Sequence, residues 1–275
     1  MSEHHGGRVI RHIDFASKHV DSRHVEVWMP PDQGTTPLPV LYMQDGQNLF
    51  HGQDSFSGAT WGVAETMARL IKEESLPAAI VVGIWNTRRR IPEYMPQRPL
   101  ADWADPRVLK RFAKTYGGRP RSDAYLRFMV EELKPFIDRE YNTRPEAASS
   151  WLMGSSMGGL ISLYAACEHP DVFSAACCLS TSWTVAGRVM IRYLERTLPS
   201  PSTHKLYFDY GGEAQIARYE RLQQAANRVL SRGGYRREEN WLTRRFPGAA
   251  HDEAAWRARV DVPLRFLLES RRAAD

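Results

Sequence analysis

The chain has 275 residues, of which 43% are hydrophobic and 25% are charged, a composition that excludes extensive disorder and suits one large domain. Its formal charge of +5 is spread over interleaved acids and bases, without the basic face of a nucleic-acid-binding protein. No apolar run is long enough to span a bilayer, and the N-terminus lacks the apolar core of a signal peptide. We therefore expect a cytoplasmic protein with no nucleic-acid or membrane partner.

The N-terminal part of the chain predicts two kinds of strand. Residues 9–15 and 20–29 alternate between polar and apolar, which is typical of antiparallel strands at a sheet edge. The short apolar runs 40–43 and 78–84 are typical of buried parallel strands, and a helical pattern over 61–74 lies between them. The first strands are therefore expected to form the edge of a larger sheet.

The rest of the chain alternates strictly between helices and strands, which predicts an α/β fold with a mostly parallel sheet and helices on both faces. Its first helix is expected to have Ser122 as N-cap. Three cysteines lie in this part, and we expect buried thiols, because neither their number nor their spacing fits a disulfide framework or a metal site. The predicted helices cover 122–140, 157–168, 185–194, 216–230 and 253–268, and the predicted strands cover 149–154, 172–179, 205–210 and 241–246.

The strongest chemical signal is the sequence Gly-Ser-Ser-Met-Gly from Gly154 to Gly158, which fits G-x-S-x-G with Ser156 at its centre. An apolar strand ends at Gly154 and a helix begins near Met157, the context in which this motif presents a nucleophilic serine on a strained turn. Ser155 is the competing serine, but it is one place out of register. The alternative interpretation is a glycine-rich turn with incidental serines.

A serine hydroxyl needs a general base, which follows the nucleophile in the chain in this fold. Three histidines follow Ser156. His169 lies at a helix end and His204 begins a strand, whereas His251 lies in the loop between the last strand and the last helix. We therefore predict His251 as the base; the alternative is a histidine that caps a helix.

The acid that orients the imidazole should follow the strand 205–210. Glu213 lies just past this strand, where a side chain can reach back to the histidine, and it is the preferred candidate. Asp209 lies inside the strand and is the alternative acid. Either residue could instead be a surface carboxylate.

The negatively charged oxygen of the reaction intermediate needs two N–H donors, an oxyanion hole. One is expected from the amide of Met157, directly after the nucleophile. The other is expected from the loop that follows strand 40–43, where Gly46 lets the backbone turn and Gln47 offers its amide. Asp45 would lie beside the pocket and could bind substrate hydroxyls. The alternative is a plain Asp-Gly turn.

Residues 86–120 have no clean period and are rich in Arg and Pro, and a connection this long is usually functional. We predict a lid or pocket wall within a single domain, 1–275. Tyr94 in this insert, together with Trp61 and Trp183, could line the acyl or alcohol site. The alternative is that these rings pack a small core under the loop.

These residues resemble the putative-esterase family of α/β-hydrolases, which includes esterase D, feruloyl and acetyl-xylan esterases, siderophore trilactone esterases and mycolyl transferases. The resemblance runs from about residue 25 to 268 and rests on 40–50, 81–86, Arg90 with Glu93-Tyr94, the Ser156 turn, and 251–253 with Trp256. It implies an α/β-hydrolase fold and ester chemistry, and it assigns the oxyanion hole to Gln47 and Met157. It leaves the acid and the substrate open.

The expected function is therefore hydrolysis of a small-molecule carboxylic ester through an acyl-enzyme, without metal or organic cofactor. Acyl transfer to a sugar or other alcohol in the same pocket is the first alternative. A peptidase of this fold usually carries an added gating domain, for which the chain is too short. A catalytically silent binding protein is the alternative from another class, and the presence of Ser156 and His251 argues against it.

Overall fold

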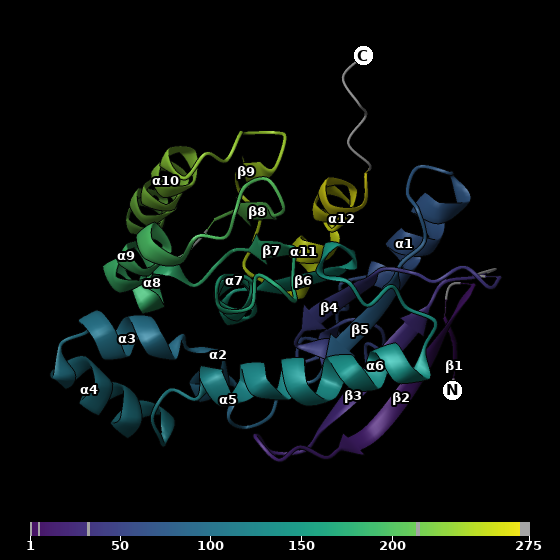
Figure 1. The fold of residues 1–275 in the computed structure, drawn as a ribbon, viewed down its shortest axis with the longest axis horizontal. Coiled ribbons are helices and arrows are strands. Elements are labelled where there is room, and N and C mark those ends of the chain that lie inside the picture. Colours follow the sequence, from purple (N-terminus) through teal and green to yellow (C-terminus); the bar gives the residue numbers. More distant parts are fainter. Residues whose placement is uncertain (1, 5, 32–33, 213–214, 270–275) are drawn as a thin grey trace.

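The computed structural model describes every residue except 1, 5, 32–33, 213–214 and 270–275. One sheet of nine strands forms its centre, in the order β1-β2-β3-β5-β4-β6-β7-β8-β9 (Figure 1). The strands β1, β2 and β3 run antiparallel to their neighbours, and all remaining pairs are parallel. This arrangement confirms the predicted α/β fold with antiparallel strands at the N-terminal edge. The strands are β1 Ser2–His4, β2 Gly7–Phe15, β3 Arg23–Met29, β4 Val40–Gln44, β5 Ile80–Ile84, β6 Ser150–Ser155, β7 Ala175–Leu179, β8 Lys205–Tyr210 and β9 Trp241–Arg245.

Helices cover both faces of the sheet, because the parallel strands are apolar on both sides. In β4, for example, Val40 and Tyr42 belong to one buried cluster and Leu41 and Met43 to the other. The helical elements are η1 Gly46–Asn48, α1 Val63–Lys72, α2 Arg90–Tyr94, α3 Gln97–Trp103, α4 Pro106–Tyr116, α5 Ser122–Arg127, η2 Phe128–Leu133, α6 Lys134–Glu140, η3 Ala147–Ser149, α7 Met157–Glu168, α8 Trp183–Ala186, α9 Arg188–Thr197, α10 Ile216–Arg232, α11 Glu253–Arg257 and α12 Asp261–Leu268.

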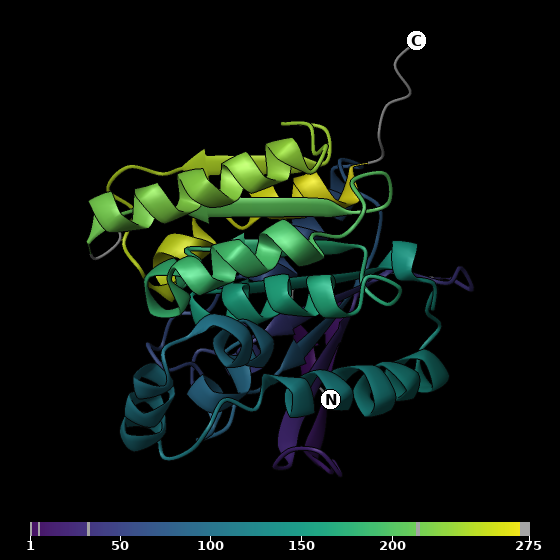
Figure 2. The same ribbon diagram turned by 60° about the vertical axis from the view of Figure 1, so that its left-hand side comes forward.

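The larger cluster lies under α5, α6, α7, α9 and α10, and the smaller one under α1, α11 and α12. Figure 2 shows α10, α9 and α7 side by side along the first of these faces, coloured from lime to teal. The three predicted buried thiols are confirmed, since all three cysteines are free and buried. Among the described residues, no helix combines the length and the apolar character that crossing a membrane requires.

The structure corrects three details of the sequence interpretation. The insert 86–120 is not irregular but contains α2, α3 and α4; the last of these has Asp105 as N-cap and Gly117 as C-cap. Ser122 is not an N-cap but the first residue of α5, with Arg121 at the N-cap position, and its hydroxyl accepts a hydrogen bond from the Gln97 amide. The closing helix is split into α11 and α12.

Candidate functional site

Ser156 connects β6 to α7 through a strained turn. Its φ of 55° and ψ of −118° place a non-glycine residue in a sparsely populated conformation, which costs about 1–3 kcal/mol and persists only where the surroundings enforce it. A hydrogen bond from its amide to the Leu179 carbonyl, 2.9 Å long, anchors the turn to β7. A Cβ on Gly154 would lie 2.5 Å from the carbonyl carbon of Gly158, so the turn closes only with glycine there. Ser156 thus lies at the carboxyl end of β6, between this strand and α7.

Ser182 contacts this serine, a relationship that the sequence did not reveal. Its Oγ lies 3.0 Å from the Ser156 Oγ, and its amide donates a 3.0 Å hydrogen bond to the Ser156 carbonyl. Ser182 follows β7, and β7 is the direct neighbour of β6, so adjacent strand ends bring the two hydroxyls together. The only signal in the sequence was a polar Ser-Thr-Ser segment directly after a buried strand.

The loop after β4 turns sharply beside α7. Asp45 has φ 57°, and a Cβ on Gly46 would lie 2.4 Å from the backbone of Gly83 in β5, so this close approach requires glycine. The Gln47 side chain accepts a 3.2 Å hydrogen bond from the Asn86 amide, which ties the loop to the residues after β5. Met157 opens α7, where the first amides have no acceptor within the helix. The two predicted oxyanion donors thus lie in a loop tied to the residues after β5 and at the start of α7.

The Asp45 carboxylate is buried and engaged on both oxygens. Arg90 donates to them from Nε at 2.7 Å and from a terminal nitrogen at 2.8 Å, and the Asn86 amide group donates at 2.6 Å. Burial alone would lower the pKa of Arg90, but the charge of Asp45 outweighs it and raises that pKa. These contacts indicate that Asp45 fixes the loop after β4. They do not support its expected role in binding substrate hydroxyls.

His251 lies in the loop between β9 and α11, as the sequence predicts, and is exposed. Its ring meets Trp256 edge-on with a centroid distance of 5.2 Å. The amide of Gly212, after β8, donates a 2.7 Å hydrogen bond to the Ala249 carbonyl, so the loops after β8 and β9 are in contact. Glu213, the preferred acid, follows Gly212 in the sequence and lies outside the described residues.

The alternative acid, Asp209, is completely buried and is engaged by other groups. Arg259 donates to both carboxylate oxygens at 3.1 and 3.2 Å, and Tyr207 and the Ser180 amide donate at 3.0 and 3.3 Å. Burial raises the pKa of Asp209, and the Arg259 charge opposes that rise. This set of partners suits a structural ion pair.

Glu253 joins the histidine loop to the loop after β4. It is buried, and its two oxygens accept hydrogen bonds from Asn48 at 3.2 Å and from Ser57 at 2.7 Å. Asn48 follows Gln47, and Glu253 lies two residues after His251. One carboxylate therefore connects the predicted oxyanion segment with the predicted base.

The three aromatic residues that were expected near the substrate are all buried, with 2% of Trp61 and none of Tyr94 or Trp183 exposed. The Trp183 indole donates to Gln223, and the Tyr94 hydroxyl accepts a 3.3 Å hydrogen bond from the Asp45 amide. Their positions favour the packing alternative. Within the described ranges, no group of three or more His, Cys, Asp or Glu side chains is arranged to hold a metal ion.

A protein-family model described as "Putative esterase" matches residues 17–267 of the chain. The chain belongs to this esterase family. Two Bacillus subtilis (strain 168) proteins, both named as uncharacterized, are relatives of this esterase-family chain. YbbA is 26% identical over 197 residues, which are 70% of this chain and 69% of YbbA. YjcH is 42% identical over 135 residues, which are 49% of this chain and 45% of YjcH.

Solved structures of esterases share the fold. The enterobactin esterase Fes of Shigella flexneri matches with a TM-score of 0.67 at 21% identity, over 95% of this chain and 59% of Fes. The chain thus spans about three fifths of the length of Fes. A ferulic acid esterase matches with a TM-score of 0.68 at 16% identity, over 95% of this chain and 98% of its own. An IroE-like serine hydrolase of Shewanella oneidensis matches with a TM-score of 0.64 at 21% identity, over 95% of this chain and 80% of its own. The esterase-family chain therefore has the α/β-hydrolase fold.

Proposed function

We propose that this protein hydrolyses small-molecule carboxylic esters through an acyl-enzyme, with Ser156 as nucleophile and His251 as general base. The observation that carries the proposal is the strained Ser156 turn between β6 and α7, in a chain that belongs to an esterase family. Such a turn exposes a serine hydroxyl at the carboxyl end of the sheet, beside the first amides of a helix.

In the proposed first step, the Ser156 Oγ attacks the ester carbonyl carbon while its proton passes to the His251 ring. The carbonyl oxygen becomes an oxyanion and accepts hydrogen bonds from the amides of Gln47 and Met157. The intermediate then expels the alcohol, which takes the proton from His251. Water attacks the acyl-enzyme in the same way, and the carboxylic acid leaves with Ser156 restored.

Glu213 is proposed as the residue that orients His251 and stabilises its protonated ring. The support is the Gly212–Ala249 hydrogen bond, which brings the chain next to Glu213 close to the histidine loop. The partners of Asp209 also support Glu213 as the acid, because they already use both oxygens of the Asp209 carboxylate. The insert 86–120 is proposed as one wall of the pocket, since its helix α2 packs on α7, the helix that Ser156 precedes.

Labelling with a fluorophosphonate tests the nucleophile, since this reagent forms a covalent bond with an activated serine. We expect one label per chain, on Ser156. The Ser156→Ala variant should lose at least about 10³-fold in kcat on p-nitrophenyl acetate while keeping its melting temperature. Ser155→Ala is the matched control one residue away and should keep its activity. A label on Ser155 would refute the assignment.

Reaction with p-nitrophenyl acetate also distinguishes a hydrolase from an acyltransferase and from a catalytically silent binding protein. An acyl-enzyme gives a burst of p-nitrophenol equal to the enzyme concentration when deacylation is slow. Addition of glycerol or glucose then distinguishes the outcomes: a hydrolase yields acetate, whereas an acyltransferase yields the acetylated alcohol as its main product. No burst and no turnover would favour a silent binding protein.

A further inference from the structure

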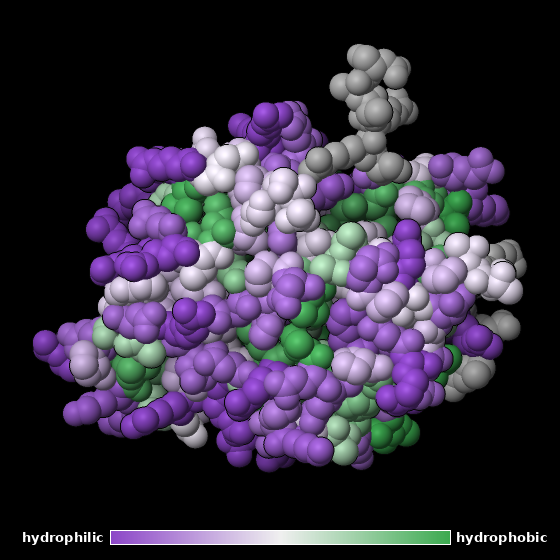
Figure 3. All heavy atoms as spheres, viewed as in Figure 1, coloured by the Kyte–Doolittle hydropathy of each residue, from purple (hydrophilic) through white to green (hydrophobic). Residues whose placement is uncertain are grey.

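A groove between α9 and α10 carries a concentration of arginines that the proposed reaction does not use. It has a volume of about 910 Å³, and five arginines and one glutamate line it, for a net formal charge of +4. In Figure 3, hydrophilic side chains crowd the surface over these two helices around small hydrophobic areas. The arginines are Arg188 and Arg192 on α9 and Arg218, Arg221 and Arg228 on α10.

Three of these arginines form no ion pair within the part of the chain that the structure describes. Among the described residues, no hydrogen bond, ion pair or ring contact engages Arg188, Arg221 or Arg228, and all three are exposed. Arg192 instead lies over the Trp103 ring at 5.3 Å, and Arg218 donates to the Thr184 carbonyl at 3.3 Å. The groove thus presents free guanidinium groups from both of its sides.

This arrangement costs stability when the groove is empty. Arg188 and Arg192 are four residues apart on one helix, and Arg218 and Arg221 are three apart on the other. Like charges at these spacings on one helix repel each other and destabilise it. A bound anion would reverse the sign of that contribution, because guanidinium groups bind carboxylates and phosphates through paired hydrogen bonds.

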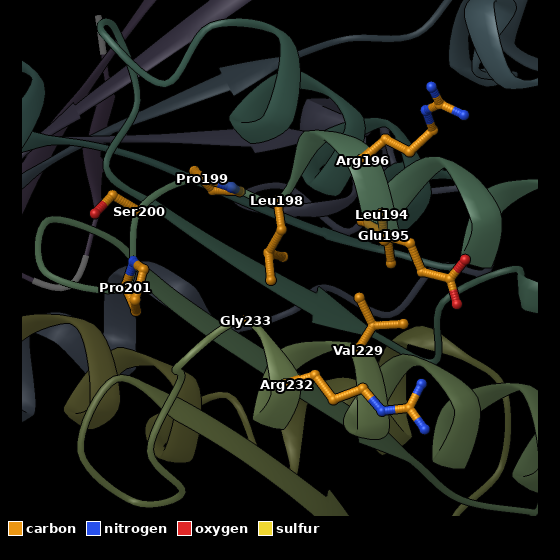
Figure 4. A pocket seen from close by; sticks show the side chains of 10 residues that line it. All are labelled: Leu194, Glu195, Arg196, Leu198, Pro199, Ser200, Pro201, Val229, Arg232 and Gly233. Carbon is orange, nitrogen blue, oxygen red and sulfur yellow. The ribbon is translucent and has the colours of Figure 1, made fainter.

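The floor of the groove is apolar. Ile191 and Leu222 line it with only 8% of each residue exposed, and Ala225 lies beside them. Arg218 and Arg228 are ten residues apart on α10, which corresponds to about 15 Å along the helix. A second pocket also has Glu195 in its lining and lies toward the ends of the two helices, where Leu198 and Val229 line it (Figure 4).

We propose that the groove between α9 and α10 is a binding site for an organic anion that carries several carboxylate or phosphate groups on an apolar body. The charged groups bind the two rows of arginines, and the apolar body covers Ile191 and Leu222. One end of the groove adjoins α8, since Arg218 contacts Thr184, two residues after Ser182. The bound anion therefore lies at α8, the helix that begins directly after Ser182, and contacts neither Ser182 nor Ser156.

The test measures binding of two probes by calorimetry and fluorescence at low salt. Tripolyphosphate supplies the charges alone, and 8-anilinonaphthalene-1-sulfonate supplies a charge on an apolar body. We expect one site per chain for each probe, displacement of the fluorescent probe by tripolyphosphate, and loss of tripolyphosphate binding as NaCl is raised. Independent binding of the two probes, or many weak sites, would refute a common site.

The decisive variant is Arg221→Glu with Arg228→Glu, which should weaken tripolyphosphate binding at least tenfold. The matched control is Arg111→Glu with Arg237→Glu, which makes the same change in net charge at exposed arginines elsewhere. The control variant should bind tripolyphosphate with a Kd within twofold of that of the unaltered protein. Equal weakening of both variants would show that overall charge, not the groove, attracts the probe. Arg221→Gln with Arg228→Gln repeats the test should the Glu variant not fold, and Ser156→Ala protein should bind normally whether or not the protein is an esterase.

Discussion

The contact between Asp45 and Arg90 supports a quantitative prediction. Replacement of Arg90 by Gln would leave the Asp45 carboxylate, whose side chain is 7% exposed, with Asn86 as its remaining side-chain donor. Loss of one partner from a fully buried ion pair costs about 3–5 kcal/mol, whereas exposed pairs contribute about 0–1 kcal/mol. The Arg90 side chain is 27% exposed, so the pair lies between these limits. We expect Arg90→Gln to lower the free energy of unfolding by about 2–3 kcal/mol.

For a chain of this length, that loss corresponds to a decrease in melting temperature of about 5 °C. Activity should decrease as well, because Asp45 directly precedes the segment that carries Gly46 and Gln47. A displacement of the Gln47 amide donor by about 1 Å can lower the rate by up to about 10²-fold, so we expect kcat on p-nitrophenyl acetate to fall by about tenfold. Thermal unfolding and initial-rate measurements on the same preparation check both numbers.

Arg89→Gln is the matched control, one residue earlier. Arg89 donates to Asp21 at 2.7 Å, a distance equal to the shortest Arg90 bond, but both side chains are about half exposed, at 47% and 52%. Its loss should therefore cost less than about 1 kcal/mol and leave kcat unchanged. Equal effects of the two replacements would refute the argument from burial. Adding Asp45→Asn to Arg90→Gln should recover part of the lost stability, because it removes the unpaired buried charge.

Three further predictions concern other contacts. Ser182→Ala should lower kcat about three- to tenfold with little change in KM or melting temperature, because it removes a hydroxyl 3.0 Å from Ser156 Oγ; Ser182→Thr should retain more activity, and an unchanged kcat would exclude a positioning role. Asp209→Asn should cost about 3 kcal/mol, because it leaves the buried Arg259 without its counter-charge; lost activity at an unchanged melting temperature would instead make Asp209 the acid. Burial raises the pKa of the Cys167 thiol to about 12, so a disulfide reagent at pH 8 should label no cysteine in the native protein and three in guanidinium chloride. Because the folded protein holds the Cys167 proton more tightly than the unfolded chain does, the contribution of this thiol to the free energy of unfolding is intact below about pH 8.5. It is lost as pH rises toward 12. Labelling of the native protein would contradict the buried thiols.

Local signals were sufficient for most of the fold and for the centre of the candidate site. The helix 157–168 was predicted with its observed bounds, and the strand 205–210 likewise, because each has a clean apolar pattern and a turn on either side. The Ser156 turn was also predictable, since its glycines, its strand and its helix are contiguous in the chain. The caps of α4, Asp105 and Gly117, were local signals too, and the irregular charge pattern of the insert concealed them.

Contacts between loops were decided only by the tertiary structure. Periodicity tells which face of an element is apolar, but not which elements become neighbours. The order β4-β6-β7-β8 brings the ends of four strands together, and with them Asp45, Ser156 and Ser182, which are far apart in the sequence. For the same reason the sequence could not tell that Trp61 and Trp183 are buried. Nor could it tell that arginines on α9 and α10, some of them 30 residues or more apart in the chain, line one groove. Strand and helix formation depends on residues close along the chain, whereas these contacts depend on how the sheet is ordered and covered.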